Sequence, residues 1–386
     1  MELRSTEQTH KPLLITLVET SPVGEHGSMA RYADLTAHAL FLAGNGAVEV
    51  HRINLALPAK QLDRVPSCFR YWVHLAWLFK SARKLGNMDS DIFHIIDGSH
   101  AWIAAWLLKK TAIATAHDII PLLQARNRFP VPSPGRMARW LIGRSILGLL
   151  SVAKIIADSN CTRDDLVTDA GIDLGKIHVI HLAAPLPVIR ESKQTYAPPW
   201  LARRNSPQAY ILHIGNNGFY KNRVGVVKIF NRLCETTSIR LIMAGPPLDA
   251  SLLSLVNSLG LSGKIDFVVN PDDARIADLY RNASLLLFPS LYEGYGWPPL
   301  EAMAFGCPVV CSSSASLPEV VGDAALLCPP DEEEKMASLC CQVLGSPLLA
   351  EDLIHKGYKR VELMGPVRMG EQILEVYRQV IWNSEK

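Results

Sequence analysis

Two glutamates lie eight positions apart in a stretch rich in glycine and proline, "LYEGYGWPPLEAMAFG" at 291–306. The apolar run before it predicts a buried strand that ends at Ser290, and Pro298 suits the first turn of a following helix. Glu293 would then lie on the loop after the strand and Glu301 at the start of the helix. Both carboxylates should face one cleft, because ligand sites in parallel sheets lie at the carboxyl ends of the strands.

The turn between the two glutamates suggests recognition of a phosphate flanked by hydroxyl groups. Its glycines let the main chain approach a ligand, and the amides of Tyr295, Gly296 and Trp297 lie near a helix N-terminus, where anions are favoured. Ionised carboxylates only accept hydrogen bonds, so Glu293 and Glu301 suit hydroxyls on either side of a phosphate. A nucleotide sugar has this shape. The alternative is that Glu301 only complements the helix dipole and Glu293 is a solvated loop residue.

Two further polar residues are expected at the same end of the sheets. The segment "LHIGNNGFYKNRVGVVKIF" predicts a strand, a glycine-containing turn and a helix that begins near Lys221, which presents amides and a cation to a phosphate. His117, in "TAHDII", follows a buried strand in the N-terminal half. A lone lysine is more often a solvated surface residue and a strand-end histidine more often structural, but together with the glutamates both favour a functional site.

Short apolar runs alternate with helical patterns along the whole chain. Four strands are predicted before a proline-rich segment at 185–207, at 13–19, 91–97, 111–118 and 153–159. Six are predicted after it, at 209–215, 239–245, 264–269, 284–290, 308–312 and 324–329. This alternation predicts parallel sheets covered by helices on both faces. We therefore predict an α/β protein with two doubly wound, Rossmann-like domains that face each other across a cleft, 1–187 and 188–365, and a helix at 366–386 that packs back toward the first domain.

Composition excludes several other classes of protein. The 39 Lys and Arg against 37 Asp and Glu argue against a nucleic-acid binder with a broad basic surface. The eight cysteines include no CxxC pair and indicate reduced thiols in a cytoplasmic protein. Asp272 and Asp273 fit a helix N-cap and a first-turn acid better than a metal site, so we expect no metal. No apolar stretch reaches the roughly twenty residues that span a bilayer.

With the sequence that follows it, "CPVVCSSSASLPEVVGDAALLCPP", the E-x7-E stretch closely resembles glycosyltransferase family 4 of the GT-B fold. The match is strong over about 265–335 and fainter, but in the right order, over nearly the whole chain. The resemblance implies that Glu293 contacts hydroxyls of the donor sugar, Glu301 the nucleotide ribose and Lys221 the leaving diphosphate. His117 would lie beside the donor sugar, near the reacting carbon.

The chain departs from the family pattern at two places. An arginine usually stands about five residues before the lysine, where this chain has Asn216 and Asn217. A Gly-Gly pair usually precedes the first helix, and the aligned pair here reads Gly27 and Ser28. Asn216 and Gly27 stay candidate donor-binding residues, and Ser28 is an alternative N-cap.

The resemblance implies a retaining glycosyltransferase that moves a hexose from a nucleotide-diphosphate sugar to a hydroxyl of a glycan or lipid-linked acceptor, in cell-surface polysaccharide biosynthesis. "HDIIPL" and "FYKN" resemble bacterial mannosyltransferases of the family, which favours GDP-mannose slightly over a UDP-sugar. No metal or other cofactor is implied. A non-catalytic nucleotide-sugar-binding subunit of a transferase complex and a GT-B phosphorylase or epimerase stay open as alternatives.

Two segments of the N-terminal half combine aromatic and basic residues, "FRYWVHLAWLFKSARK" at 69–84 and "RMARWLIGRSILGLL" at 136–150. Such a helix either lies on an anionic membrane surface or packs on its own sheet. We expect packing on the sheet for the first segment, and the second is equally ambiguous. A cytoplasmic protein with peripheral contact to the inner face of the membrane stays open.

Overall fold

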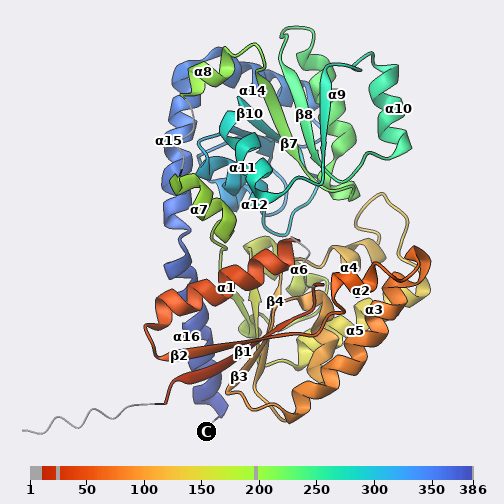
Figure 1. Cartoon of the computed structure of the whole chain (residues 1–386), viewed down its shortest axis with the longest axis vertical. Coiled ribbons are helices and arrows are strands. Elements are labelled where there is room, and N and C mark those ends of the chain that lie inside the picture. Colours follow the sequence, from red (N-terminus) through yellow and green to blue (C-terminus); the bar gives the residue numbers. More distant parts are fainter. Residues whose placement is uncertain (1–10, 23–26, 195–198, 385–386) are drawn as a thin grey trace, which may run out of the picture.

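The computed structural model describes residues 11–22, 27–194 and 199–384 of the chain (Figure 1). Two sheets of six strands lie one above the other, and every strand pair in them is parallel. The first sheet has the order β2-β1-β3-β4-β5-β6 and the second β12-β11-β10-β7-β8-β9. The α/β architecture of two doubly wound sheets is therefore confirmed.

The strands of the first sheet are β1 (Leu13–Glu19), β2 (Val48–Asn54), β3 (Ile92–Ile95), β4 (Ala112–Ala116), β5 (Lys154–Ala157) and β6 (Ile177–Val179). Those of the second are β7 (Tyr210–Ile214), β8 (Arg240–Gly245), β9 (Ile265–Val269), β10 (Leu285–Phe288), β11 (Val309–Ser312) and β12 (Leu326–Cys328).

The helices up to the domain junction are α1 (Ser28–Gly44), α2 (Ala59–Leu62), α3 (Ser67–Ala82), η1 (Arg83–Asn87), η2 (Gly98–Trp106), α4 (Ile120–Ala125), α5 (Arg136–Ser151), α6 (Asn160–Thr168) and η3 (Leu174–Lys176). Those that follow are α7 (Leu186–Gln194), α8 (Trp200–Arg204), η4 (Phe219–Lys221), α9 (Arg223–Leu233), α10 (Ala250–Ser258), α11 (Asp273–Asn282), α12 (Trp297–Ala304), α13 (Leu317–Val321), α14 (Glu333–Gly345), α15 (Pro347–Leu363) and α16 (Pro366–Ser384).

Our sequence prediction missed β2 and β6, the two edge strands of the first sheet. β2 reads "VEVHRIN", and each of its residues is half-buried or exposed, so it has no continuous buried apolar run. An edge strand of this kind carries a weaker hydrophobic signal than a strand buried on both faces. β6 has only three residues. All six strands of the second sheet were predicted.

The proline-rich segment at 185–207 connects the two sheets and is itself partly helical. It contains α7, which spans the predicted boundary at 187/188, and α8. Trp200 of α8 is buried and donates a hydrogen bond from Nε1 to the Ser284 carbonyl at 2.8 Å. Arg203 donates to the Gly306 carbonyl at 2.7 Å. The segment therefore forms part of the packing of the second domain.

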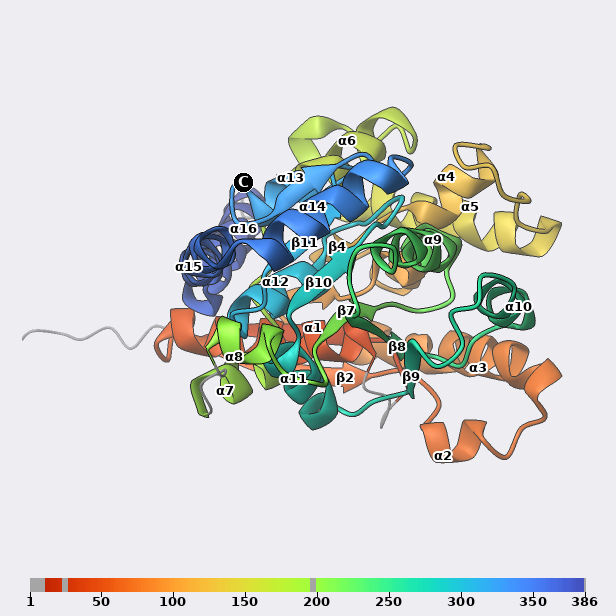
Figure 2. The ribbon, with the colours of Figure 1, turned by 90° about the horizontal axis from the view of Figure 1, so that it is seen from above.

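The last helix, α16, returns to the first domain and packs on α1 (Figure 2). A Cβ at Gly370 would lie 2.1 Å from the Ala39 carbonyl oxygen, so the two helices cross in close backbone contact. Tyr377 forms a hydrogen bond of 2.7 Å with Nδ1 of the buried His94. Among the described residues no single helix is long and apolar enough to cross a membrane, and only a pair bent by 98°, 333–345 with 347–382, passes that test.

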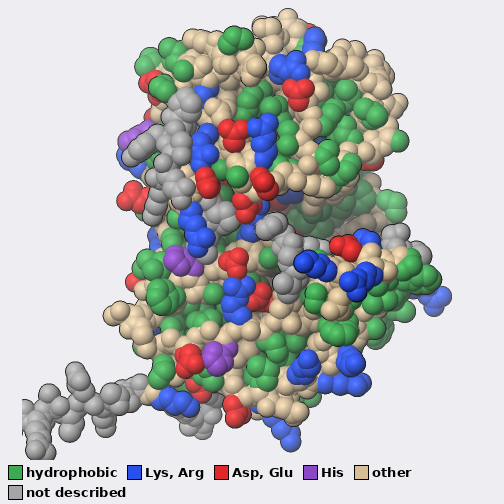
Figure 3. All heavy atoms as spheres, in the orientation of Figure 1, with side chains coloured by type: hydrophobic (Ala, Val, Ile, Leu, Met, Phe, Trp, Pro, Cys, Tyr) green, Lys and Arg blue, Asp and Glu red, His purple; other side chains and the backbone are tan. Residues whose placement is uncertain are grey.

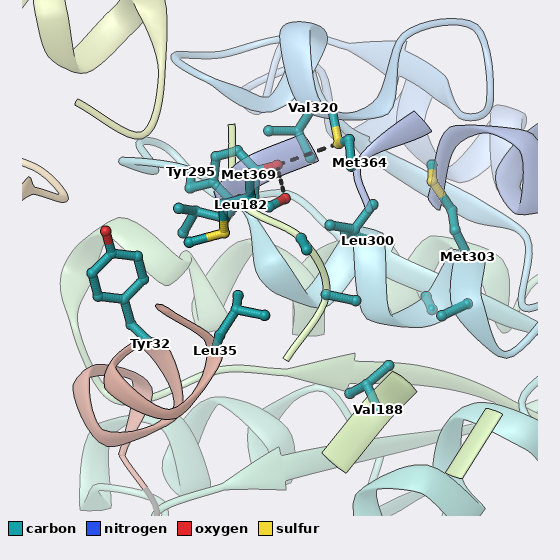
Figure 4. Close-up of a cluster of buried hydrophobic side chains, with 14 of the residues drawn as sticks. Tyr32, Leu35, Leu182, Val188, Tyr295, Leu300, Met303, Val320, Met364 and Met369 are labelled. Carbon is teal, nitrogen blue, oxygen red and sulfur yellow. Dashed lines mark hydrogen bonds between the residues drawn. The ribbon is translucent and has the colours of Figure 1, made fainter. Parts of the chain in front are cut away.

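One apolar cluster runs through the junction of the two domains (Figure 4). Tyr32 and Leu35 come to it from α1, and Leu300 from α12. Tyr295 donates its hydroxyl to the Leu182 carbonyl at 2.6 Å. This cluster fixes the 293–297 turn of the second domain against the chain that leaves the first domain.

Candidate active site

A cleft of about 550 Å³ separates the carboxyl ends of the two sheets. The space-filling view shows the hollow between the upper and lower domains (Figure 3). Every site residue predicted from the sequence lines this cleft, namely Gly27, His117, Asn216, Lys221, Glu293, Tyr295, Gly296, Trp297 and Glu301. Their roles toward a ligand remain predictions.

Glu293 and Lys221 form an ion pair on the second-domain side of the cleft. The Lys221 Nζ lies 2.8 Å from both carboxylate oxygens of Glu293. The exposed fractions of the two side chains are only 12% and 8%. The charge that would bind a phosphate is therefore neutralised by the carboxylate that would bind a sugar hydroxyl.

Glu301 holds a second cation, which comes from the first domain. Arg31 of α1 contacts Asp273 of α11 and places Nη1 3.6 Å from Oε1 of Glu301. The Tyr280 hydroxyl donates to Oε2 of Glu301 at 2.8 Å. Burial raises the pKa of Glu301, although Arg31 and Tyr280 oppose that shift. Arg31 thus joins the two domains at the predicted ribose site.

His117 is held on both sides of its ring. Nδ1 lies 2.5 Å from Oδ2 of Asp158, and Nε2 lies 2.9 Å from the Ile96 carbonyl oxygen. Burial alone would lower the pKa of His117, but the Asp158 carboxylate, followed by Asp97 and the carbonyl, raises it to about 9. The ring is therefore a cation at neutral pH. Because both nitrogens are engaged, they orient the ring within the first domain and are not free for a ligand in this state.

The turn after Glu293 needs glycine for close packing. A Cβ at Gly294 would lie 2.0 Å from the His117 carbonyl oxygen, so a larger residue would push the domains apart. The polar atoms of the Tyr295 and Trp297 side chains are already engaged by the chain that leaves the first domain, since Tyr295 donates to the Leu182 carbonyl and Trp297 donates from Nε1 to the Ala183 carbonyl at 3.0 Å. These two residues can therefore serve a ligand through their main chain, as the sequence suggested.

On the same, second-domain side of the cleft, Asn216 and Asn217 stand where the family usually has an arginine. Asn216 accepts a hydrogen bond from the Gly218 amide at 2.8 Å and lines the cleft. Arg223, the nearest arginine in the chain, contacts Asn217 and the Pro246 carbonyl. Its guanidinium is therefore already engaged beside the turn.

Two capping assignments can be compared with the structure. Asp272 is the N-cap of α11, where its carboxylate accepts from the Arg275 amide at 2.8 Å, and Asp273 is the acid of the first turn, as predicted. Ser28 is not the N-cap of α1, because Gly27 occupies that position. Residues 24–26 of the same loop lie outside the described part of the chain.

Among the residues that the structure describes, no group of three or more His, Cys, Asp or Glu side chains could hold a metal ion.

Three cleft residues escaped the sequence analysis or received little weight there: Arg31, Asp118 and Asp158. Asp158 follows β5 just as His117 follows β4, so the strand-end rule that selected His117 would also have found it. Asp118 is adjacent to His117, and burial raises the pKa of its carboxyl. Arg31 carries no signal of this kind, because its partners lie more than 240 positions further along the chain.

Family models match both halves of the chain. The model described as "Glycosyltransferase Family 4" matches residues 36–186, and the model "Glycosyl transferases group 1" matches residues 201–360. The chain is a family 4 glycosyltransferase. The GT-B fold that the resemblance implied is confirmed for this glycosyltransferase by its structural neighbours.

Among its relatives is the O-antigen chain mannosyltransferase B of Escherichia coli, which is 29% identical over an alignment of 274 residues that covers 69% of this chain and 70% of the relative. Among solved structures, sucrose-phosphate synthase of Thermosynechococcus elongatus superimposes with a TM-score of 0.72 at 18% identity and covers 96% of this glycosyltransferase and 100% of that chain. HepE of Anabaena, in complex with UDP-glucose, has a TM-score of 0.65 at 16% identity, with coverages of 95% and 100%.

Proposed function

We propose that this glycosyltransferase moves a hexose, with mannose favoured, from a nucleotide-diphosphate sugar to a hydroxyl of a glycan or lipid-linked acceptor. The reaction would retain the anomeric configuration and serve cell-surface polysaccharide synthesis on the cytoplasmic side of the membrane. The observation that carries the proposal is the convergence of Glu293, Glu301 and Lys221 on one cleft beside the 295–297 turn. The complex of HepE with UDP-glucose supports a nucleotide-sugar donor. The O-antigen relative supports mannose.

The cleft contains a partner for each part of such a donor. Glu301 would accept hydrogen bonds from the ribose and Glu293 from the sugar. The leaving diphosphate would be met by Lys221, once it moves off Glu293, and by the amides of the 295–297 turn at the start of α12. Closure of the two domains over the donor would exclude water and limit hydrolysis.

Two groups are candidates to receive the proton of the acceptor hydroxyl. One is the leaving phosphate itself, which needs no protein base. The other is Asp118, which lines the cleft on the first-domain side and has a raised pKa because it is buried. Asp118→Asn separates the two: a transfer rate within about threefold of wild type supports the phosphate, whereas a loss of about 10²-fold supports the carboxylate.

The first test is a thermal-shift screen of the full chain against UDP, GDP, ADP and their sugar conjugates, with magnesium and with EDTA. A ligand that binds only the folded state raises Tm. We expect one nucleotide series, the GDP series first, to stabilise the wild type equally in EDTA. Lys221→Met should lose most of that shift, and Glu351→Gln, an exposed change on α15, should keep it. No shift with any conjugate, or a shift only with magnesium, would contradict the proposal.

A further inference from the structure

The first domain carries an exposed surface that is both aromatic and basic, formed by α3 with the start of η1 and by α5. On α3 the large side chains that we expected to pack on the sheet are in fact exposed: Phe69 by 59%, Trp72 by 47% and Trp77 by 37%. Their place in the core is taken by other residues. Leu78 is fully buried, and Phe79 stacks on Trp102 of η2 with ring centroids 4.2 Å apart. The expectation of core packing is therefore wrong for the outward face of α3.

The outward face of α5 has the same character. Met137, Trp140 and Leu147 are exposed by 52%, 54% and 57%. Its inner face is fixed to η2, because a Cβ at Gly148 would lie 2.0 Å from the Ala101 carbonyl oxygen. α3 and α5 both pack on η2, and both helices lie on the side of the first domain away from α16 (Figures 1 and 2).

The charge of this region is strongly one-sided. Residues 64–157 carry thirteen of the 39 Lys and Arg of the chain but only four of the 37 Asp and Glu. Neither α3 nor α5 contains an acidic residue. The six basic residues of the outward faces, which have no ion pair within the described part of the chain, are Lys80, Arg83, Lys84, Arg136, Arg139 and Arg144.

We infer that this surface, α3 with the start of η1 and α5, docks the protein on an anionic lipid bilayer. Exposed aromatic side chains beside unpaired cations match the boundary between acyl chains and anionic headgroups, where rings enter the interface and each Lys or Arg is attracted to the surface charge. The absence of carboxylates from both helices removes the repulsion that such a surface would meet. A folded protein partner would not require a basic face so free of acidic residues.

The position of the surface relates it to the cleft. Green and blue side chains lie on the side of the lower domain where Figure 1 draws α2 and α3 (Figure 3). α4 begins three residues after His117 and leads to α5, so the cleft and the docking face are joined by a short stretch of chain. A bilayer bound there would bring a lipid-linked acceptor to the mouth of the cleft. Only this last step rests on the proposed function.

The test is sedimentation of the full chain with vesicles, in the absence of donor and acceptor. We expect binding to phosphatidylcholine vesicles that contain about 30% phosphatidylglycerol, at least about tenfold weaker binding to pure phosphatidylcholine, and loss of binding in high salt. Two combined variants should each weaken vesicle binding at least about tenfold. One replaces both exposed tryptophans, Trp72→Gln with Trp77→Gln, and the other replaces three cations, Lys80→Gln with Arg83→Gln and Lys84→Gln. The controls are Leu348→Gln and Lys359→Gln, which are exposed changes on α15.

The surface variants should fold normally, because their side chains lie on the exposed faces of α3 and η1 and not in the core, and an unchanged Tm checks this. Equal binding to both kinds of vesicle, no binding to either, or full binding by the variants would overturn the inference. If the wild type self-associates through this face and ignores vesicles, the occupant is a second copy and the bilayer assignment is wrong. Nucleotide binding is measured separately by thermal shift, so failure here is distinguishable from failure of the proposed function.

Discussion

Glu293→Gln should tighten the binding of free nucleoside diphosphate while it impairs transfer of the sugar. In the structure Lys221 donates to both oxygens of Glu293 at 2.8 Å, in a pair that is nearly buried. A diphosphate that needs Lys221 must therefore draw it away from this carboxylate. A neutral glutamine holds the lysine less strongly, so the phosphate meets less competition. The sugar, in contrast, loses an ionised acceptor for its hydroxyls.

The size of the effect follows from the strength of hydrogen bonds to charged groups. Each contributes about 1.5–3 kcal/mol, and a glutamine oxygen retains part of that. We therefore expect the interaction of Lys221 with position 293 to weaken by about 1–2 kcal/mol when glutamine replaces glutamate. Because 1.4 kcal/mol is a factor of ten in an equilibrium constant, free diphosphate should bind about 5- to 30-fold more tightly. The lost contact to the sugar should lower kcat/KM by about 10- to 150-fold.

Calorimetric titration of diphosphate and of the sugar conjugate measures both affinities, and single-turnover kinetics measures transfer. The gain in diphosphate affinity should vanish when Glu293→Gln is combined with Lys221→Met, because the freed amine is its source. Glu351→Gln on α15 controls for removal of a negative charge elsewhere. Diphosphate binding by Glu293→Gln that is equal to or weaker than wild type would refute the reasoning that Glu293 and phosphate compete for Lys221.

Three other predictions concern the same cleft. Glu301→Ala should weaken free nucleotide by about 10- to 100-fold, and unchanged affinity in titration would remove the ribose assignment. The pKa of His117 is raised from 6.5 to about 9, so the folded protein binds this proton more tightly than the unfolded chain. The resulting stability, on the order of 3 kcal/mol, is fully present below pH 6.5 and is lost as the pH rises through 9. The free energy of unfolding, measured by denaturation, should therefore fall with pH across this range in wild type and not in Asp158→Asn. Gly294→Ala should lower Tm by several degrees and reduce turnover because of its clash with His117, whereas Gly143→Ala, which meets nothing within 4 Å, should not lower Tm.

The parts of the site that could be predicted from the sequence are those encoded by neighbouring residues. Glu293 and Glu301 are set by one strand, one turn and one helix, so their common direction follows from local geometry. Lys221 follows from the same pattern three strands earlier in the chain, after β7. The contact of Arg31 with Asp273 and Glu301 could not be predicted in this way, because it depends on how the two domains are docked. A pattern within one segment carries no information about that docking.

The orientation of α3 shows a second limit of sequence patterns. Its segment contains aromatic residues on more than one side, and any of them could fill the core. The structure selects Phe79 because Trp102 of η2 lies opposite and stacks on it. Trp72 is then left facing solvent. Which aromatic side is buried is thus decided by the shape of a neighbouring element, which lies 20 or more residues further along the chain.

The ion pairs of the cleft suggest why it would select a donor with both a diphosphate and hydroxyl groups. Without a ligand, Glu293 is neutralised by Lys221, and Glu301 lies beside Arg31. A nucleotide sugar can exchange these partners without stranding a charge, since its phosphate takes the lysine and its hydroxyls take the carboxylates. Inorganic diphosphate would leave Glu293 buried and unpaired, and a neutral sugar would offer nothing to the cation. Because an unpaired buried charge costs several kcal/mol, inorganic diphosphate should bind far more weakly than the complete donor. A neutral sugar should also bind weakly, because it cannot draw Lys221 away from Glu293.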